Sequence, residues 1–193
     1  MRLARMNKSF FIASLAALLT FSSGCSTTGP GTGDPAARAK AIDASVDSAL
    51  TLLYQQEPSS RDLVGRAAGV LVFPSVTEAS FIIGASRGTG ALRVGGKTVS
   101  YHATSSGSFG LQAGAQSSAV FLLFMTQDAL RNFQNSRGWT IGADASVTLL
   151  TVGATANMTT ATAQQPIIGY VLSNRGLLAG VRMDGTRITT LNL

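Results

Sequence analysis

The chain has 193 residues, of which 45% are hydrophobic and 12% charged, with a formal net charge of +6. This length suits one domain, and the apolar residues are enough for a substantial core. A single cysteine excludes an internal disulfide, a single histidine excludes a multi-histidine metal site, and the modest charge does not indicate a nucleic-acid partner.

Residues 1–24 have the pattern of a secretory signal peptide. They combine a basic start, an apolar run over 10–21 that is too short to span a bilayer comfortably, and small residues at 22–24. Three of the fifteen Lys and Arg lie in this segment and all nine Asp and Glu follow it, so the chain without it carries a net charge of +3.

Cys25 follows Gly24 directly, in a pattern that resembles the lipobox of bacterial lipoproteins, although Ser22 occupies the position where leucine is usual. The resemblance implies a lipoprotein signal peptide that is cleaved before Cys25, acylation of this cysteine, and a flexible tether over residues 25–33. Ser26 follows in place of an aspartate, which by analogy implies an outer-membrane anchor, on the periplasmic face or at the surface. The alternative is an ordinary secreted protein with a free thiol.

A first helix is expected to begin after Asp34, because this residue type caps helices and Pro35 suits the first helical position. The helix is expected to end near Glu57 and Pro58. Its apolar residues recur on one face, at Ile42, Val46, Leu50, Leu53 and Tyr54.

Two interpretations of this apolar face are open. In one, the face packs on a sheet. In the other, the helix lies on a membrane surface, where Arg38 and Lys40 would favour anionic lipid while Asp43 and Asp47 would oppose it.

A second, short helix is expected to follow. Ser59 with Asp62 three residues later is typical of a capping box. This helix is expected to end near Arg66.

The stretch 68–93 predicts a curved sheet. Residues 70–73 favour a strand that Pro74 stops, because proline lacks the N–H that a ladder needs, and residues 81–83 favour a second strand. Glycine within such sequence is typical of a bulge, a bend or a close backbone approach, here at Gly84, Gly88 and Gly90.

The remaining residues alternate between strands and turns. Gly95-Gly96 supplies the positive φ angles of a tight hairpin turn, and residues 119–125 predict a fully buried strand. Thr126 is expected to cap a short helix that stops at 136–138 and carries Leu130 and Phe133. Further strands are expected over 139–157, 167–172, 177–183 and, after a turn at Asp184-Gly185, 187–193. Together these elements predict an α+β fold, with a curved, barrel-like, mainly antiparallel sheet, an N-terminal amphipathic helix and short additional helices.

Six runs of the chain, in order, carry a family resemblance: AAGVLVFPSV, FIIGASRGTGAL, GSFGLQAGAQS, VFLLFMTQDALRNF, WTIGADASV and GLLAGVRMDGTRI. They resemble the SYLF domain, which is found in bacterial lipoproteins and in eukaryotic adaptors that bind phosphoinositides and regulate actin. The resemblance covers nearly all of residues 34–193, and it departs at Ala79-Ser80, where the family often has Ala-Gly. It implies the same α+β fold, lipid binding in which the N-terminal amphipathic segment takes part, and no catalysis. The actin role belongs to the eukaryotic members and is not carried over.

The residue inventory also disfavours an enzyme. A hydrolase would need His102 beside a serine such as Ser105, Ser106 or Ser108, and serine-rich segments are common without catalysis. His102 is instead expected at a strand end, with Tyr101 beside it in the core or in a groove. The sequence indicates no cofactor and no metal site.

The favoured hypothesis is a non-catalytic domain, residues 34–193, that binds anionic phospholipid while the lipid anchor holds it on the membrane. The candidate lipid-binding residues lie on or beside the two predicted helices and are Arg38, Lys40, Arg61 and Arg66. The alternative is a structural or protein-interaction lipoprotein of the envelope, such as a surface antigen, that holds an unknown protein partner.

Overall fold

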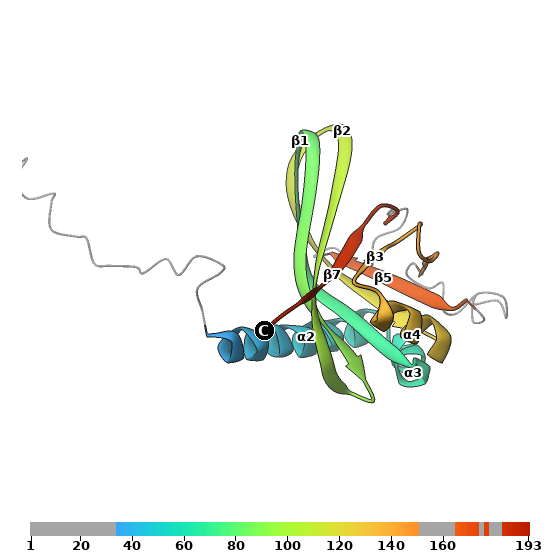
Figure 1. The fold of residues 1–193 in the computed structure, drawn as a ribbon. Helices are drawn as coiled ribbons and strands as arrows, with labels where there is room; N and C mark the ends of the chain where they lie inside the picture. Colours follow the sequence, from blue (N-terminus) through green and yellow to red (C-terminus); the bar gives the residue numbers. More distant parts are fainter. Residues whose placement is uncertain (1–33, 151–164, 174–175, 178–182) are drawn as a thin grey trace, which may run out of the picture. The chain divides into compact units, whose positions relative to one another are not determined.

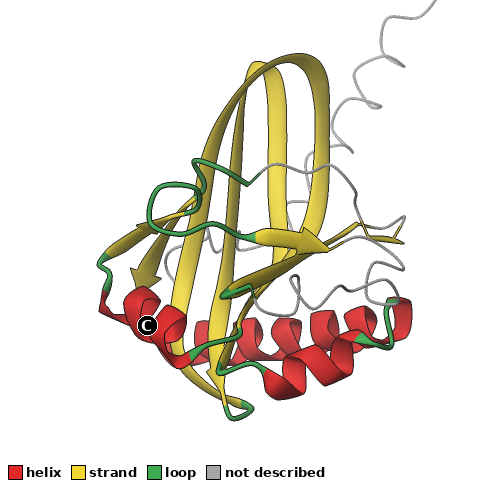
Figure 2. Ribbon diagram, turned by 90° about the vertical axis from the view of Figure 1, so that its right-hand side faces the viewer, coloured by secondary structure: helices red, strands yellow, loops and turns green. Residues whose placement is uncertain are grey.

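The structure is a computed structural model that describes residues 34–150, 165–173, 176–177 and 183–193, and the side chains of these except at 79–83, 108–115 and 176–177. The described residues form an α+β domain in which a curled, mixed sheet of seven strands makes a half-barrel with helices packed against it (Figures 1 and 2). This confirms the predicted fold class. The predicted signal peptide, Cys25 and the tether lie outside the described residues.

Helix α2, Pro35–Gln56, begins and ends as the sequence predicts. The Asp34 carboxylate accepts a hydrogen bond from the Ala36 N–H at 3.2 Å, and Pro35 occupies the first turn, where no intrahelical partner is needed. At the other end the Glu57 N–H donates to the Leu53 carbonyl at 2.8 Å. The predicted apolar face is buried against the sheet, around Val46 and Leu53.

Helix α3, Ser60–Arg66, has the predicted extent but not the predicted cap. The Ser59 side chain makes no capping bond, because the Ser59 backbone is already helical (φ −68°, ψ −17°), whereas a capping side chain needs an extended backbone. Its hydroxyl bonds the Glu57 carboxylate instead. Asp62 pairs with Arg66 at 2.8 Å, so the capping-box prediction is wrong.

Strands β1, Gly69–Val94, and β2, Lys97–Phe124, form one long antiparallel hairpin. Gly95 (φ 57°) and Gly96 (φ 77°) make its turn, as predicted. The prediction that Pro74 ends a strand is wrong, because β1 continues through it. Pro74 lies at a register shift between Phe73 and Val76, where its missing N–H interrupts no ladder pair.

The hairpin is folded over on itself, and Figure 2 shows it arching and returning. A second register shift lies between Ser80 and Ile82 of β1, near the middle of the hairpin. Beyond it, β1 comes back so closely that a Cβ added at Gly90 would lie 2.0 Å from the Val72 carbonyl oxygen, and one at Gly88 would lie 2.8 Å from the Ser75 carbonyl oxygen. The expected close backbone approach at these glycines is confirmed.

The folded hairpin forms the centre of the sheet, and further strands pair with each end of β2. Strand β5, Ile167–Ser173, pairs with the C-terminal end of β2, and β7, Arg187–Leu191, pairs with its N-terminal part. The outer strands are β3, Gly138–Thr140, beside β7, with β4, Thr148–Leu150, and β6, Gly176–Leu177, beside β5. Only the β4–β5 pair is parallel among the described strands. The strands expected over 139–157 and 177–183 lie partly outside the described residues. The described parts of these ranges include β3, β4 and β6.

Helix α4, Gln127–Asn135, is capped as predicted, since the Ala129 N–H donates to the Thr126 hydroxyl at 3.2 Å. Leu130 and Phe133 are buried. None of the helices within the described ranges is both long enough and apolar enough to cross a membrane.

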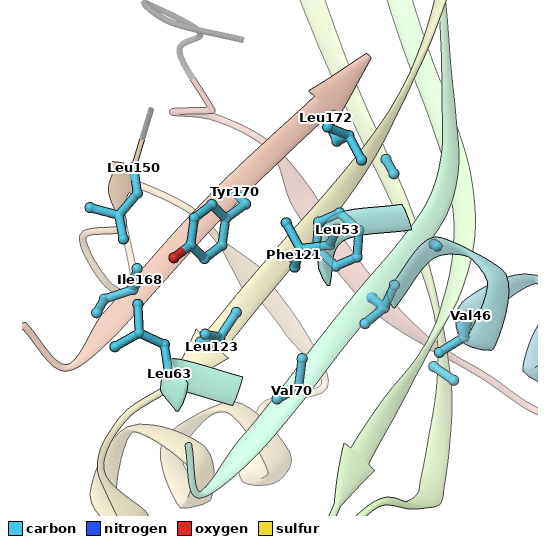
Figure 3. Packing of buried hydrophobic residues seen from close by; sticks show 14 residues of the cluster. Val46, Leu53, Leu63, Val70, Phe121, Leu123, Leu150, Ile168, Tyr170 and Leu172 are labelled. Atoms are coloured by element: carbon cyan, nitrogen blue, oxygen red, sulfur yellow. The ribbon is translucent and has the colours of Figure 1, made fainter. Parts of the chain in front are cut away.

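Alternate side chains of the central strands enter two different cores. Val70 and Val72 face the outer core, which α2 and α3 cover, whereas Leu71 and Phe73 face the inner core, which α4 helps to close. Figure 3 shows the outer core with residues contributed by both helices and four strands, among them Leu53, Leu63, Phe121 and Tyr170. Burial on both faces explains why residues 119–124 are continuously apolar rather than alternating.

Gly90→Ala is expected to destabilise the domain strongly, because the added methyl group would meet backbone atoms that cannot rotate away. We expect a loss of about 3 kcal/mol or more in the free energy of unfolding, measured by urea denaturation. Gly107→Ala is the matched control, since nothing lies within 4 Å of its added Cβ, and it should change that free energy by less than about 0.5 kcal/mol. Equal losses for the two variants would contradict the close approach.

Candidate functional site

The four predicted lipid-binding cations fall into two separate groups. Arg38 and Lys40 lie in the first two turns of α2, while Arg61 and Arg66 belong to α3. Because α2 has 22 residues, it is about 33 Å long. Arg61 lies near its far end, with the guanidinium carbon 4.5 Å from the centre of the Tyr54 ring. The structure therefore does not gather the four residues into one cluster.

The two cations of α3 already have partners. Arg61 stacks over Tyr54, a contact worth roughly 0.5–1 kcal/mol at an exposed site. Burial raises the pKa of the Tyr54 hydroxyl, and the positive charge of Arg61 acts against this rise. Arg66 pairs with Asp62 one turn away, and both side chains are more than half exposed. Such a pair contributes little stability but cancels the charge of Arg66.

Arg38 and Lys40 differ from these two. Neither makes an ion pair with any other residue in the described part of the chain. Lys40 is exposed and Arg38 is half-buried. Positive charge near a helix N-terminus is slightly unfavourable to the helix, so helix stability does not account for these two residues.

Sequence reasoning missed the most connected cation of this region, Arg93 of β1. Its side chain is only 17% exposed and reaches two acidic residues of α2. One guanidinium nitrogen lies 2.7 Å from the Asp47 carboxylate; the other donates to the Asp43 carbonyl at 3.3 Å and lies 3.8 Å from the Asp43 carboxylate. The signal for this contact is Asp43 and Asp47 one turn apart in α2, but nothing local identifies their partner fifty residues on.

Two hydroxyls of β2 complete the same network. Thr98 donates to the Asp43 carboxylate at 2.7 Å, and Tyr101 donates to its other oxygen at 2.9 Å. Tyr101 is thus half-buried beside α2, in agreement with its expected place in the core or a groove. The network fixes α2 on the hairpin, and it binds both carboxylates that were expected to oppose anionic lipid.

A cavity of about 310 Å³ lies beside this network, between α2, α3 and the β1–β2 turn. Leu50, Val64 and Val70 give it apolar walls, and Arg93 and Tyr54 give it polar ones. The charge of Arg93 is already countered by two aspartates. The cavity therefore offers a weaker site for an anion than the unpaired cations at the start of α2.

Residues 105–192 match the family Ysc84, described as Las17-binding protein actin regulator. The match runs from within β2 to the end of the sheet and confirms the SYLF resemblance over those residues, whereas α2, α3 and β1 precede it. A search of curated proteins finds no match to this chain.

His102 lies just before the matched SYLF region, inside β2 and not at a strand end as expected. It is 6% exposed, and its ring centre lies 5.0 Å from that of Phe133. Its Nε2 bonds the Ser100 hydroxyl at 2.8 Å. Burial lowers the pKa of His102 to about 4, although a hydrogen bond with the Thr189 backbone acts in the opposite direction.

Two of the serines considered as nucleophiles, Ser105 and Ser106, have other neighbours than His102. Ser106 bonds Ser86 across the hairpin at 2.6 Å, and Ser105 lies between β1 and β7 opposite Arg87 and Arg187. The side chain of Ser108 lies outside the described part of the structure. Among the described residues, no group of three or more His, Cys, Asp or Glu could hold a metal ion.

Acidification should destabilise the domain through His102. The unfolded chain binds a proton near pH 6.5, whereas folded His102 stays neutral down to about pH 4, so the stability is full above pH 6.5 and falls below it. Between pH 6.5 and pH 5 we expect a loss of about 2 kcal/mol in the free energy of unfolding, measured by denaturant titration.

The control for this experiment is His102→Gln, which removes the only histidine of the chain. Its free energy of unfolding should change little over the same pH range. A slope in the variant as steep as in the unchanged protein would show that His102 is not the titrating group.

Proposed function

We propose that this protein is a non-catalytic lipid-binding lipoprotein, which is anchored through acylated Cys25 and contacts anionic phospholipid with the outer face of α2. The match of residues 105–192 to a family described as a Las17-binding protein agrees with a binding role. Actin regulation, which the family description names, is not part of the proposal, because the signal peptide and lipobox predict a bacterial envelope protein.

The observation that carries the proposal is the division of charge along α2. Asp43 and Asp47 are engaged by Arg93, Thr98 and Tyr101 of the hairpin. Arg38 and Lys40, by contrast, have no ion pair within the described ranges. The positive charge at the start of α2 is therefore not balanced by its own acidic residues, and each such cation near an anionic bilayer contributes about 1 kcal/mol of attraction.

The position of these two cations also suits the anchor. Eight residues separate Cys25 from Asp34, so an extended tether spans at most about 30 Å. Arg38 and Lys40 follow within six residues of Asp34, whereas α3 begins beyond the far end of a 22-residue helix. A cysteine held in the bilayer thus limits the distance between the start of α2 and the membrane to about 30 Å.

The buried face of α2 determines how such a contact would form. Val46 and Leu53 are fully buried against the sheet, so inserting this face into lipid would require α2 to leave the core. The outer face is mostly small or polar, and its one large exposed apolar residue is Leu52, at 42% exposure. The proposed contact is therefore electrostatic docking on the headgroups, with α2 remaining on the sheet.

The test is co-sedimentation of residues 34–193, without the anchor, with neutral and anionic vesicles. We expect retention on anionic vesicles that weakens as salt shortens the screening length. Arg38→Gln with Lys40→Gln removes about 2 kcal/mol of attraction and should weaken retention roughly 30-fold.

The matched control removes two exposed cations near α4, by Arg131→Gln with Arg137→Gln. This variant loses the same net charge and should bind as the unchanged domain does. Equal weakening by both double variants would mean that the domain binds through its net charge and not through the start of α2. No retention on any vesicle would refute the proposal and favour the protein-interaction alternative.

A further inference from the structure

The cavity between α2, α3 and the β1–β2 turn, of about 310 Å³, has an apolar lining that the chain leaves partly uncovered. Val70 is 6% exposed, whereas Leu50 and Val64, which pack against the outer core, are only half-buried. Pockets for drug-sized molecules measure about 300–1,000 Å³, so this volume suits a small molecule. Such a molecule would remove further apolar surface of Leu50 and Val64 from water, which is favourable.

Three exposed glycines of the lining leave one side of this cavity open. A Cβ added at Gly65, Gly95 or Gly96 would meet nothing within 4 Å. Gly95 and Gly96 are needed for the hairpin turn, but Gly65 lies within α3 and has no positive φ angle. Glycine is among the least favourable residues within a helix, so neither the backbone nor the packing of α3 accounts for Gly65. Its lack of a side chain keeps the cavity accessible to a ligand.

The lining also contains a buried hydrogen-bond donor without a partner. Both terminal guanidinium nitrogens of Arg93 are engaged by Asp43 and Asp47. The Nε atom of Arg93, by contrast, is buried and bonds nothing. Among the described residues, two other buried side-chain atoms lack a partner, in Ser60 and Tyr170, but neither residue lines this cavity. Because buried polar groups are normally hydrogen-bonded, this N–H indicates an acceptor that the chain itself does not supply.

The surroundings of Arg93 determine the class of that acceptor. Arginine offers only donors, so the ligand must present an oxygen or nitrogen that accepts. A carboxylate or phosphate would gain little from the charge of Arg93, which Asp47 at 2.7 Å and Asp43 at 3.8 Å already counter, and it would lose its hydration beside apolar walls. An ammonium group offers donors only and would meet the Arg93 N–H without an acceptor. The group that fits is an uncharged carbonyl oxygen, as in an amide or an ester.

We propose that this cavity binds a small uncharged carbonyl compound. Its oxygen accepts the hydrogen bond of the Arg93 Nε–H, and its hydrocarbon part packs on Leu50, Val64 and Val70. The Tyr54 ring, over which the Arg61 guanidinium lies at 4.5 Å from the ring centre, forms a further wall.

The first experiment titrates hexanamide, hexanoate and hexylamine at neutral pH into the chain from residue 25 to residue 193 and follows the methyl NMR signals. We expect saturable shifts of Leu50, Val64 and Val70 with hexanamide, in the millimolar range that suits a ligand of this size. Val171 and Ile188, which belong to the inner core, should not shift. Hexanoate and hexylamine should bind about tenfold more weakly or less. No saturable shift with hexanamide, or equal binding of either charged compound, would overturn the proposal.

Gly65→Leu tests the location of the site. The leucine side chain would occupy the open side of the cavity, and leucine favours a helix, so this variant should stay folded and bind hexanamide about tenfold more weakly or less. Ala44→Leu, which adds an apolar side chain at an exposed position of α2, is the matched control and should leave the affinity unchanged. Equal affinities in the two variants would place the ligand elsewhere and overturn the site.

Arg93→Lys tests the hydrogen bond. Lysine keeps a positive charge beside Asp47 but has a methylene group where arginine has Nε. Hexanamide should bind about tenfold more weakly, because a hydrogen bond to a charged group is lost, whereas cyclopentane, which has no acceptor, should bind both proteins alike. Arg66→Lys on α3 is the matched control and should change neither affinity. Unchanged binding of hexanamide, or a parallel loss of cyclopentane, would overturn the role of Nε.

The site is tested separately from lipid binding. Leu50 and Tyr54 lie in the last two turns of α2, whereas Arg38 and Lys40 lie in its first two. Arg38→Gln with Lys40→Gln should therefore leave hexanamide binding unchanged, whatever its effect on vesicles. A loss of hexanamide binding in that variant would contradict the location of the site.

Discussion

The close passage of β1 past itself, at Gly90 and Val72, is the constraint on which the rest of the fold depends. A hairpin as long as β1–β2 would otherwise be an extended ribbon with two exposed faces. Folding it over turns one face inward, where it closes the inner core, and leaves the other face to α2 and α3. The approach is possible only because no side chain stands at Gly90, where a Cβ would lie 2.0 Å from a carbonyl oxygen.

The placement of α2 follows from this fold in two ways. The outer face of the sheet offers an apolar surface, which Val46 and Leu53 cover. The position of α2 along that surface is then defined by Arg93, which sits near the hairpin turn and reaches Asp43 and Asp47. The Asp47 carboxylate in this network is 62% exposed, so water weakens its ion pair, and apolar burial supplies most of the attachment. The ion pairs of Arg93 engage Asp43 and Asp47. Arg38 and Lys40 are therefore the charged residues of α2 without an ion pair among the described residues.

Local signals predicted the elements that depend on nearby residues. Asp34 and Thr126 cap their helices, and Gly95-Gly96 makes the turn, because each acts within a few residues of itself. Pro74 misled the prediction because a proline is compatible with a strand at a bulge, and the bulge depends on the partner strand.

The contact in the candidate site that the sequence did not predict also depends on a partner segment, which here is far away along the chain. Arg93 meets α2 from about fifty residues away, and its partners appear in the sequence only as two aspartates one turn apart. Arg38 and Lys40 were chosen as candidates from a local pattern and remain a prediction. The contacts that engage Asp43 and Asp47 became evident only from the structure.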